Sequence, residues 1–316
     1  MEIVPFQPAF LPQASALFAQ NFQRLRKAVP VLPDAVEGPW PAAEKLAWLF
    51  GFCPGIAALE DGKLIGYMGW FTVERFRGSA RKGAYCPEWG HAALEGRKSE
   101  VYRAMYRAAS AQWAAAGCQV HALTLLAHDP DAERTWFWNG FGLTVVDAIR
   151  PMVPLGVSLA GDLCIRKATQ EDAGVLSQLD AEHCQHYSHP PVLMPLPTNE
   201  SPAEFAAFLA HPKNRIWLAL DGETPVGFMR FTGGNFDAVE IINADTTVMI
   251  NAAYVRPAYR GRRAAVLMLE SAIREYAALG IERLAVNFES FNPEAALFWM
   301  RYFEPICLSV LRVPEA

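Results

Sequence analysis

The chain repeats itself, and this repeat limits the folds open to it more than any other feature of the sequence. A strand, a tight Asp-Gly turn and a second strand are predicted around Asp61-Gly62 and again around Asp221-Gly222, 160 positions later. Internal similarity at a fixed spacing indicates a duplicated structural unit. We therefore expect two copies of one fold.

Later segments repeat at a slightly larger spacing of 163 positions. A long helix that ends at Gly117 is matched by one that ends at Gly280, and both glycines suit a helix C-cap. The segment that begins at Asp129 is matched by the segment that begins at Asn292, and each continues with proline into an aromatic helix. The repeat therefore extends over nearly the whole of each half.

The length of 316 residues allows two domains of roughly 100–200 residues each. We predict a first domain over residues 1–155 and a second over residues 156–316. Each half is expected to contain strand, helices, hairpin, strand, helix, strand, helix and strand, and to end on its own apolar strand, at Arg150 and at Arg312. The expected fold class is α/β, of the α+β type, with two tandem mixed-sheet domains and flanking helices.

Composition excludes several classes of partner. The formal net charge is −5, which disfavours nucleic acid and anionic membranes. The six cysteines form no CxxC pair and have no zinc-ligand spacing, so we expect free thiols in a reducing cytoplasm. The first residues lack the pattern of a signal peptide, and no apolar run is long enough to span a bilayer.

Two segments of the second half carry a resemblance to a known family. Residues Tyr254 to Ala265 lead from a predicted strand through a turn into a helix. This segment resembles the acetyl-CoA loop of the GNAT superfamily, Arg/Gln-x-x-Gly-x-Gly/Ala, which appears here as Arg260-x-x-Arg263-x-Ala265. The segment Asn292-Pro-Glu-Ala, followed by an aromatic helix, resembles the second signature of that family, Asn-x-x-Ala.

The resemblance covers essentially the whole second half and implies a GNAT fold with acetyl-CoA as co-substrate. The physical chemistry of the loop agrees with this, because a helix start has unpaired N–H groups and a positive dipole end that attract a pyrophosphate. Small residues let the backbone approach the ligand, and arginines add cationic donors. The expected coenzyme-binding residues are Tyr254, Val255, Arg260, Gly261, Arg262, Arg263, Ala264, Ala265 and Asn292.

Arg263 departs from the family pattern, which has glycine at this place. A side chain is tolerated if Arg263 has ordinary helical φ and ψ angles. Coenzyme binding is weakened if the phosphate must lie against its Cα atom. Both alternatives follow from the sequence.

The first half has a different segment at the place of the loop. The spacing of 163 aligns residues 97–102 with residues 260–265, and no glycine remains there. Glu100 would repel a pyrophosphate, and Tyr102 stands where a small residue is wanted. We predict that the first half is a degenerate copy. Trp89 and His91 either line a cleft there or, as we favour, pack and form hydrogen bonds.

The resemblance also implies direct attack of a neutral amine on the thioester, with a backbone N–H near Val255 stabilising the oxyanion. Trp299 stands where the family often has a tyrosine that serves the leaving thiol. Tyr302 lies three residues further, about the same helical face, and is our candidate for that role; its alternative role is a core aromatic. Glu289 is the candidate general base, and the alternatives for the base are Glu240 and Asp245.

Three histidines, His183, His186 and His189, recur at intervals of three residues. A metal site is conceivable at such a spacing, but the two prolines after His189 should end the helix there. The proposed chemistry needs no metal, and we expect these residues to line the substrate side instead.

The predicted function is an acetyl-CoA-dependent N-acetyltransferase that acts on a primary amine of a small molecule or a peptide. The alternative is a non-catalytic acyl-CoA-binding or regulatory protein, which the departures at Arg263 and Trp299 favour. An aminoacyl-transferring relative is a third hypothesis, against which the net acidic charge argues. The sequence leaves open whether the protein is a monomer or a homodimer.

Overall fold

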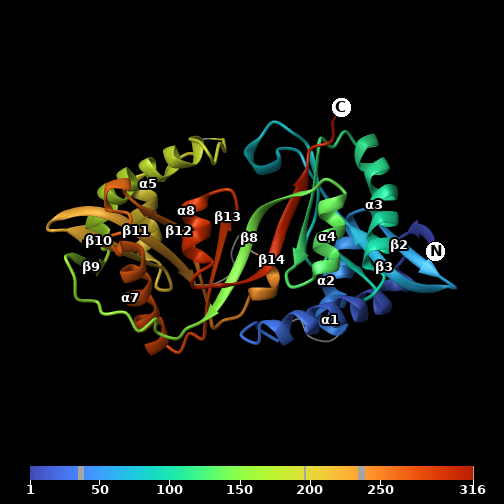
Figure 1. The fold of residues 1–316 in the computed structure, drawn as a ribbon, viewed down its shortest axis with the longest axis horizontal. Coiled ribbons are helices and arrows are strands. Elements are labelled where there is room, and N and C mark those ends of the chain that lie inside the picture. The colour runs from blue at the N-terminus through green and yellow to red at the C-terminus, as the bar shows by residue number, and fades with distance from the viewer. Residues whose placement is uncertain (35–38, 196, 234–238, 316) are drawn as a thin grey trace. The chain divides into compact units, whose positions relative to one another are not determined.

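The computed structural model describes residues 1–34, 39–195, 197–233 and 239–315. The chain forms two compact units (Figure 1). Unit 1 comprises Met1–Asp147, Val239–Ile241 and Glu304–Ala316. Unit 2 comprises Ala148–Ala238 and Ile242–Phe303. None of the helices in the described part of the chain combines the length and the apolarity needed to cross a bilayer.

Unit 1 has an antiparallel sheet in the order β1-β2-β3-β6 and a second set of strands in the order β4-β5-β7-β14-β8. These strands are β1 (Glu2–Pro5), β2 (Gly55–Glu60), β3 (Lys63–Gly69), β4 (Phe71–Val73), β5 (Gly83–Cys86), β6 (His91–Ala93), β7 (Val120–Leu126), β8 (Gly142–Pro151) and β14 (Glu304–Arg312). Its helices are α1 (Leu11–Ala28), α2 (Pro39–Phe52), α3 (Lys98–Ala115) and α4 (Pro130–Trp138).

The core of unit 1 forms where α3 packs on the first sheet. Val101 and Met105 of α3 are fully buried in the same cluster as Ile56 of β2. Gly66 of β3 allows this close approach, because a Cβ atom there would lie 2.4 Å from a methyl group of Val101. The predicted Asp-Gly turn between β2 and β3 is confirmed, with a positive φ at Gly62.

Unit 2 has strands in the order β8-β13-β12-β11-β10-β9. Pairing is antiparallel from β9 to β12 and parallel between β12 and β13. The strands are β9 (Leu163–Lys167), β10 (Arg215–Asp221), β11 (Thr224–Gly233), β12 (Thr247–Val255) and β13 (Arg283–Glu289). The helices are α5 (Ala173–Ser188), α6 (Pro202–Ala210), α7 (Ala264–Ala278) and α8 (Pro293–Trp299).

Helices cover both faces of the sheet in unit 2 (Figure 1). Successive residues of a strand point to opposite faces. Ile216 and Leu218 of β10 accordingly join a buried cluster with Leu176 of α5. Trp217, between them, points the other way, and its ring lies 5.7 Å from the ring of Tyr276 on α7. The mixed α/β class predicted from the sequence is confirmed.

The last strands of the two repeats are exchanged. β14 pairs antiparallel with β7 of unit 1, from Cys307 opposite Leu126 to Arg312 opposite His121. β8, the last strand of the first repeat, begins in unit 1 and ends in unit 2. Both halves end on an apolar strand as predicted, but the last strand of the chain completes the sheet of unit 1, because two apolar strands of similar pattern can each complete either sheet. The boundary between residues 155 and 156 stays a prediction.

Candidate functional site

A split in the sheet of unit 2 defines the candidate site. The parallel pairing of β12 with β13 ends where Ile250 lies opposite Val286. β12 continues to Val255 and β13 to Glu289, each beyond the last paired residue. A register shift in the β11–β12 pairing leaves Asn251 as the extra residue at the start of this split. Backbone polar groups on the open sides of the split can therefore bind water or a ligand.

The loop after β12 leads into α7 with an open helix start. Gly261 has a φ of +80°, and a Cβ atom there would meet no atom within 4 Å. The Leu267 N–H donates to the carbonyl of Arg263 at 3.0 Å. The N–H groups of Ala264 and Ala265 precede this first helical bond and lie at the positive end of the helix dipole.

Arg263 adopts the left-handed backbone conformation that glycine usually supplies. Its φ and ψ are 67° and 4°, and it is the N-cap of α7. Arg263 therefore does not meet the condition of the first alternative, ordinary helical angles, and the second alternative stays a prediction. A left-handed conformation costs a residue with a side chain about 1–2 kcal/mol. The guanidinium turns back to donate to the carbonyl of Ser158 at 3.1 Å.

The other two arginines of the loop have acidic partners. Arg260 donates from Nε to the carbonyl of Val255 at 3.2 Å and pairs with Glu294 at 2.7 Å. Arg262 pairs with Asp221 at 3.2 Å. The side chains of Arg260 and Arg262 are 31% and 41% exposed, so solvent and salt screen both pairs. The sequence analysis missed Glu294 and Asp221, although Glu294 lies within the quoted Asn292 segment.

Asn292 starts α8 beside this loop. Its side chain accepts a hydrogen bond from the Ala295 N–H at 3.4 Å, and the residue is 4% exposed. An asparagine that accepts from the third helical N–H is a helix N-cap. The structure thus places Asn292 where it orients α8, and Glu294 with it. A contact of Asn292 with the coenzyme remains a prediction.

Tyr254 and Val255 form the end of β12. The hydroxyl of the buried Tyr254 donates to Glu182 of α5 at 3.3 Å, and burial raises its pKa. Glu182 also accepts from Arg256 at 2.7 Å. These contacts fix the strand end against α5, so Tyr254 contributes its backbone rather than its hydroxyl to the split.

The candidate acid–base residues lie around the far end of β13. Glu289 is the last residue of β13, half-buried, and its carbonyl accepts from the Asn292 N–H at 3.1 Å. Tyr302 lies in the turn after α8, because the helix ends at Trp299. The expectation that Tyr302 shares a helical face with Trp299 is therefore wrong. Its ring packs at 5.2 Å from that of Phe298.

The two alternative bases lie elsewhere. Glu240 belongs to unit 1, where its N–H donates to buried Glu88 at 2.6 Å and its carboxylate pairs with Lys45. Asp245 is exposed in the turn before β12. Neither carboxylate is a lining group of the split in unit 2.

The three histidines do not form a metal site. α5 ends at Ser188, so His189 lies off the helix as predicted, and its Nδ1–H donates to the carbonyl of Gln185 at 2.5 Å. His183 lies 3.6 Å from Asp180, and His186 lies 3.6 Å from Glu294. Within the described ranges, no three His, Cys, Asp or Glu residues are placed to hold one metal ion.

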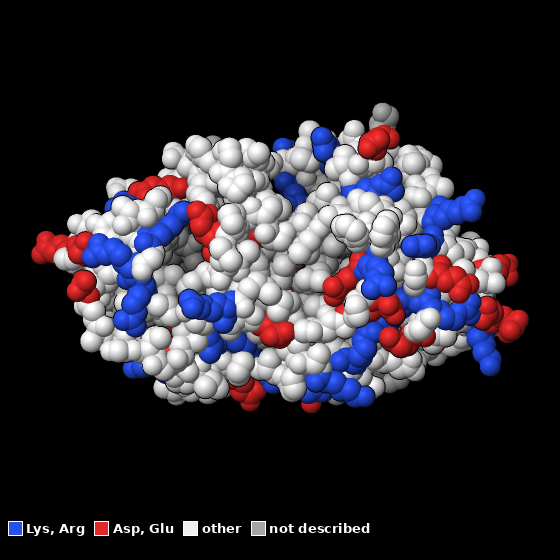
Figure 2. Space-filling model, in the orientation of Figure 1, with Lys and Arg blue, Asp and Glu red and all other residues white. Residues whose placement is uncertain are grey.

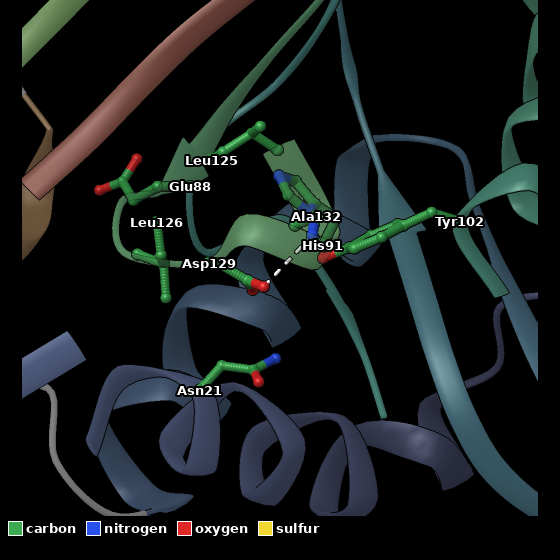
Figure 3. A pocket seen from close by; sticks show the side chains of 8 residues that line it. All are labelled: Asn21, Glu88, His91, Tyr102, Leu125, Leu126, Asp129 and Ala132. Carbon is green, nitrogen blue, oxygen red and sulfur yellow. Dashed lines mark hydrogen bonds between the residues drawn. The ribbon is translucent and has the colours of Figure 1, made fainter. Parts of the chain in front are cut away.

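The corresponding region of unit 1 is a small pocket lined by polar and apolar side chains (Figure 3). His91 donates from Nε2 to the carbonyl of Thr124 at 3.0 Å, so its Nδ1 accepts from the hydroxyl of Tyr102 at 3.1 Å. Burial lowers the pKa of His91 to about 4 and keeps the ring neutral. The pocket is lined by Asn21, Glu88, His91, Tyr102, Leu125, Leu126, Asp129 and Ala132.

The start of α3 in unit 1 is covered by internal ion pairs. Lys98 is 1% exposed and pairs with Asp129 and with Glu95. Arg97 pairs with Glu100 at 2.9 Å and with Glu60. The cations of this helix start are thus bound to carboxylates of the chain, one of them deep in the protein. The predicted ordinary packing of His91 agrees with this arrangement.

The charged side chains on the face drawn in Figure 2 are of both signs and are interspersed among large uncharged areas. This distribution agrees with the small net charge of −5. It shows no large basic field of the kind that binds nucleic acid on this face.

A split parallel pair of strands with an open helix start beside it defines an acyl-CoA N-acyltransferase fold of the GNAT type. The chain matches the solved structure of a GCN5-related N-acetyltransferase from Sphaerobacter thermophilus with a TM-score of 0.58 at 13% identity. That match covers 99% of this chain and 97% of the other. None of the proteins with curated descriptions matches.

A second solved structure agrees on the fold. It is the GCN5-related glucosamine N-acetyltransferase region of a fungal multi-domain GH3 β-N-acetylglucosaminidase, with a TM-score of 0.54 at 11% identity. The match covers 98% of this chain and 38% of that one. Residues 181–303 match the family model for the acetyltransferase (GNAT) family. The match to the family model lies in the second half of the chain, and the likeness to the two solved structures shows a GNAT-type fold over both halves.

Proposed function

We propose that the protein is an acetyl-CoA-dependent N-acetyltransferase whose site lies in unit 2. The observation that carries the proposal is the split between β12 and β13, which opens beside the start of α7. There a glycine, two alanines and three arginines surround helical N–H groups that precede the first intrahelical bond. The combination suits a pyrophosphate at the helix start and a thioester arm in the split.

The proposed coenzyme contacts follow the loop. Arg260, Arg262 and Arg263 supply positive charge, and Gly261 gives the backbone room to approach the phosphates. Ala264 and Ala265 present the N–H groups of the first turn without bulk. Val255 and Tyr254 supply backbone at the end of β12, and Asn292 orients α8 beside the loop.

The proposed reaction is direct transfer. The nitrogen of a neutral primary amine attacks the thioester carbonyl and forms a C–N bond, while an N–H near Val255 stabilises the oxyanion. The C–S bond then breaks, the thiolate takes a proton, and the amine nitrogen loses one. We assign Glu289 as the base for the amine and Tyr302 as the proton donor to the thiolate. No step needs a metal ion or a covalent enzyme intermediate.

The acceptor is proposed to be a primary amine of a small molecule or a peptide. The second candidate is a non-catalytic acyl-CoA-binding protein. One observation favours it: Trp299 is 6% exposed and packs edge-on against Phe303 at the place where the family often has a tyrosine. An indole N–H is a far weaker acid than a phenol.

Two measurements, taken together, distinguish the enzyme from the non-catalytic protein. A rise of the thermal unfolding midpoint on adding acetyl-CoA is expected for both. Release of free thiol in the presence of a panel of small amines and peptides is expected only for the enzyme. Coenzyme binding without thiol release from any amine would favour the non-catalytic function. No binding at millimolar acetyl-CoA would contradict both.

A further inference from the structure

The three arginines that surround the start of α7 are all held by other parts of unit 2. Arg260 pairs with Glu294, Arg262 pairs with Asp221, and Arg263 donates to a backbone carbonyl. Two of the three partners are carboxylates, the groups that resemble phosphate most closely as arginine ligands. The loop therefore has internal anions bound at its cationic side chains.

The carboxylate of Glu294 is the better positioned of the two. Glu294 lies in the first turn of α8, which begins with the Asn292 cap and Pro293. Its carboxylate lies 2.7 Å from Arg260 and 3.6 Å from His186 of α5. It is thus placed between the loop and α5 by a helix rather than by a flexible segment. Asp221 is the last residue of β10 and the aspartate of the Asp-Gly turn.

A diphosphate at the helix start would meet these two carboxylates. A guanidinium that already binds a carboxylate has fewer donors for phosphate, and the carboxylate repels the incoming charge. Both pairs are partly exposed, so the cost of separating them is small. The ligand can therefore displace them, and each displacement lowers the net affinity.

We propose that Glu294, assisted by Asp221, is an internal competitor for the coenzyme phosphates. It holds Arg260 in position in the free protein and is displaced when the diphosphate binds. This inference rests on the proposed function, since it assumes that acetyl-CoA binds at the start of α7. It makes the site selective for ligands with enough negative charge to replace the carboxylate.

The test compares dissociation constants for coenzyme A by isothermal titration calorimetry. Glu294→Gln is expected to tighten binding about three- to tenfold, because it removes both the competing ligand and the repulsion. Asp221→Asn is expected to tighten binding by about twofold, since the Arg262–Asp221 pair is longer than the Arg260–Glu294 pair. Glu275→Gln is the matched control: it removes the same charge from α7, where Glu275 pairs with Lys167, and should leave the constant unchanged.

Pantetheine, which carries no phosphate, provides the second arm. Its affinity should be the same for the wild-type protein and the Glu294→Gln variant, whereas a merely structural role of Glu294 would change both ligands alike. Binding of coenzyme A by the wild type with unchanged or weaker binding by Glu294→Gln overturns this inference alone. Absence of binding in wild type and variants at millimolar coenzyme A overturns the proposed function, and the inference with it.

Discussion

The starts of α3 and α7 are equivalent places in the two repeats, but they differ in helix length and in the burial of their charged side chains. Both helices are followed by a glycine with positive φ, Gly117 and Gly280, which marks a common end. α3 has 18 residues and α7 has 15, so α3 begins about one turn earlier. In unit 1 that extra turn occupies the place that the arginine-containing loop has in unit 2.

The charged side chains at the two helix starts also differ in how far they are buried. Lys98 of α3 is buried against Asp129, whereas Arg260 and Arg262 near α7 remain about a third or more exposed. Separating a buried ion pair costs a large free energy, whereas separating a screened surface pair costs little. The charges at the helix start of unit 1 are thus paired inside the protein, whereas those of unit 2 stay partly exposed, which the proposed coenzyme site requires.

The largest expected effect comes from placing the residue of unit 1 into unit 2. Ala265→Tyr reproduces Tyr102, which lines the pocket of unit 1, and should abolish coenzyme binding at millimolar concentration because the ring blocks the approach to the helix start. Ala265→Ser, a small substitution, is the control and should retain binding. Binding by the tyrosine variant with an unchanged dissociation constant would contradict the assignment.

The N-caps of α4 and α8 allow a reciprocal exchange. Asp129→Asn keeps a capping group but leaves Lys98 without its buried partner, so the free energy of unfolding should fall by about 3 kcal/mol. Asn292→Asp keeps the cap in unit 2 and should change stability by less than about 0.5 kcal/mol. Chemical denaturation measures both, and equal losses would refute the contrast between a structural and an open helix start.

The pH dependence of stability should come from unit 1. Burial raises the pKa of Glu88, a pocket residue, to about 7. The folded state then holds this proton more tightly than the unfolded state, so stability falls as pH rises from about 4.5 to 7 and levels off above that range. The loss is on the order of 3 kcal/mol.

Denaturation at several pH values between 4 and 8 tests this. Glu88→Gln should make the profile less steep, with part of the slope remaining because burial also raises the pKa of Asp147 to about 7. Glu223→Gln, a substitution of an exposed carboxylate in unit 2, should leave the profile unchanged. A profile of the Glu88 variant that is as steep as that of the wild type would show that the slope arises elsewhere.

A smaller loss is expected for the cap of α8. Asn292→Ala removes the acceptor of the Ala295 N–H and should cost about 1 kcal/mol of unfolding free energy. Unaltered stability, measured by denaturant unfolding, would mean that the cap contributes nothing.

The smallest effect concerns the backbone of Arg263. Arg263→Gly relieves the left-handed strain and loses the bond to Ser158, so the free energy of unfolding should rise by only about 0.5 kcal/mol. Arg263→Ala keeps the strain and loses the bond, and should be less stable than the wild type. If both variants are destabilised alike, the left-handed conformation is not strained in this setting.

The repeat and the local signals of helix and turn predicted much of the fold. The Asp-Gly hairpins and the glycine caps depend on neighbouring residues, which the sequence shows directly. The exchange of β8 and β14 depends instead on a choice between two similar partners. A choice of that kind has no local signal.

The candidate site likewise has some features that the sequence predicts and others that it does not. The loop from Arg260 to Ala265 was predictable because its chemistry is contiguous. Glu294 and Asp221 contact the arginines from other elements, so no contiguous pattern predicts these pairs. The left-handed φ of Arg263 has no signal in the sequence, because the residue is not a glycine. Tyr302 was placed on a helix that ends three residues earlier, since no proline or glycine marks that end.

We propose that acetyl-CoA binds at the start of α7 and not at the start of α3. Hydrogen exchange of the backbone amides, with and without saturating acetyl-CoA, tests this because it reports on both helix starts in one experiment. Bound acetyl-CoA should slow exchange over residues 261–267 and leave exchange over residues 97–102 unchanged. Protection over residues 97–102, or no protection at either helix start when the ligand is bound, would contradict it.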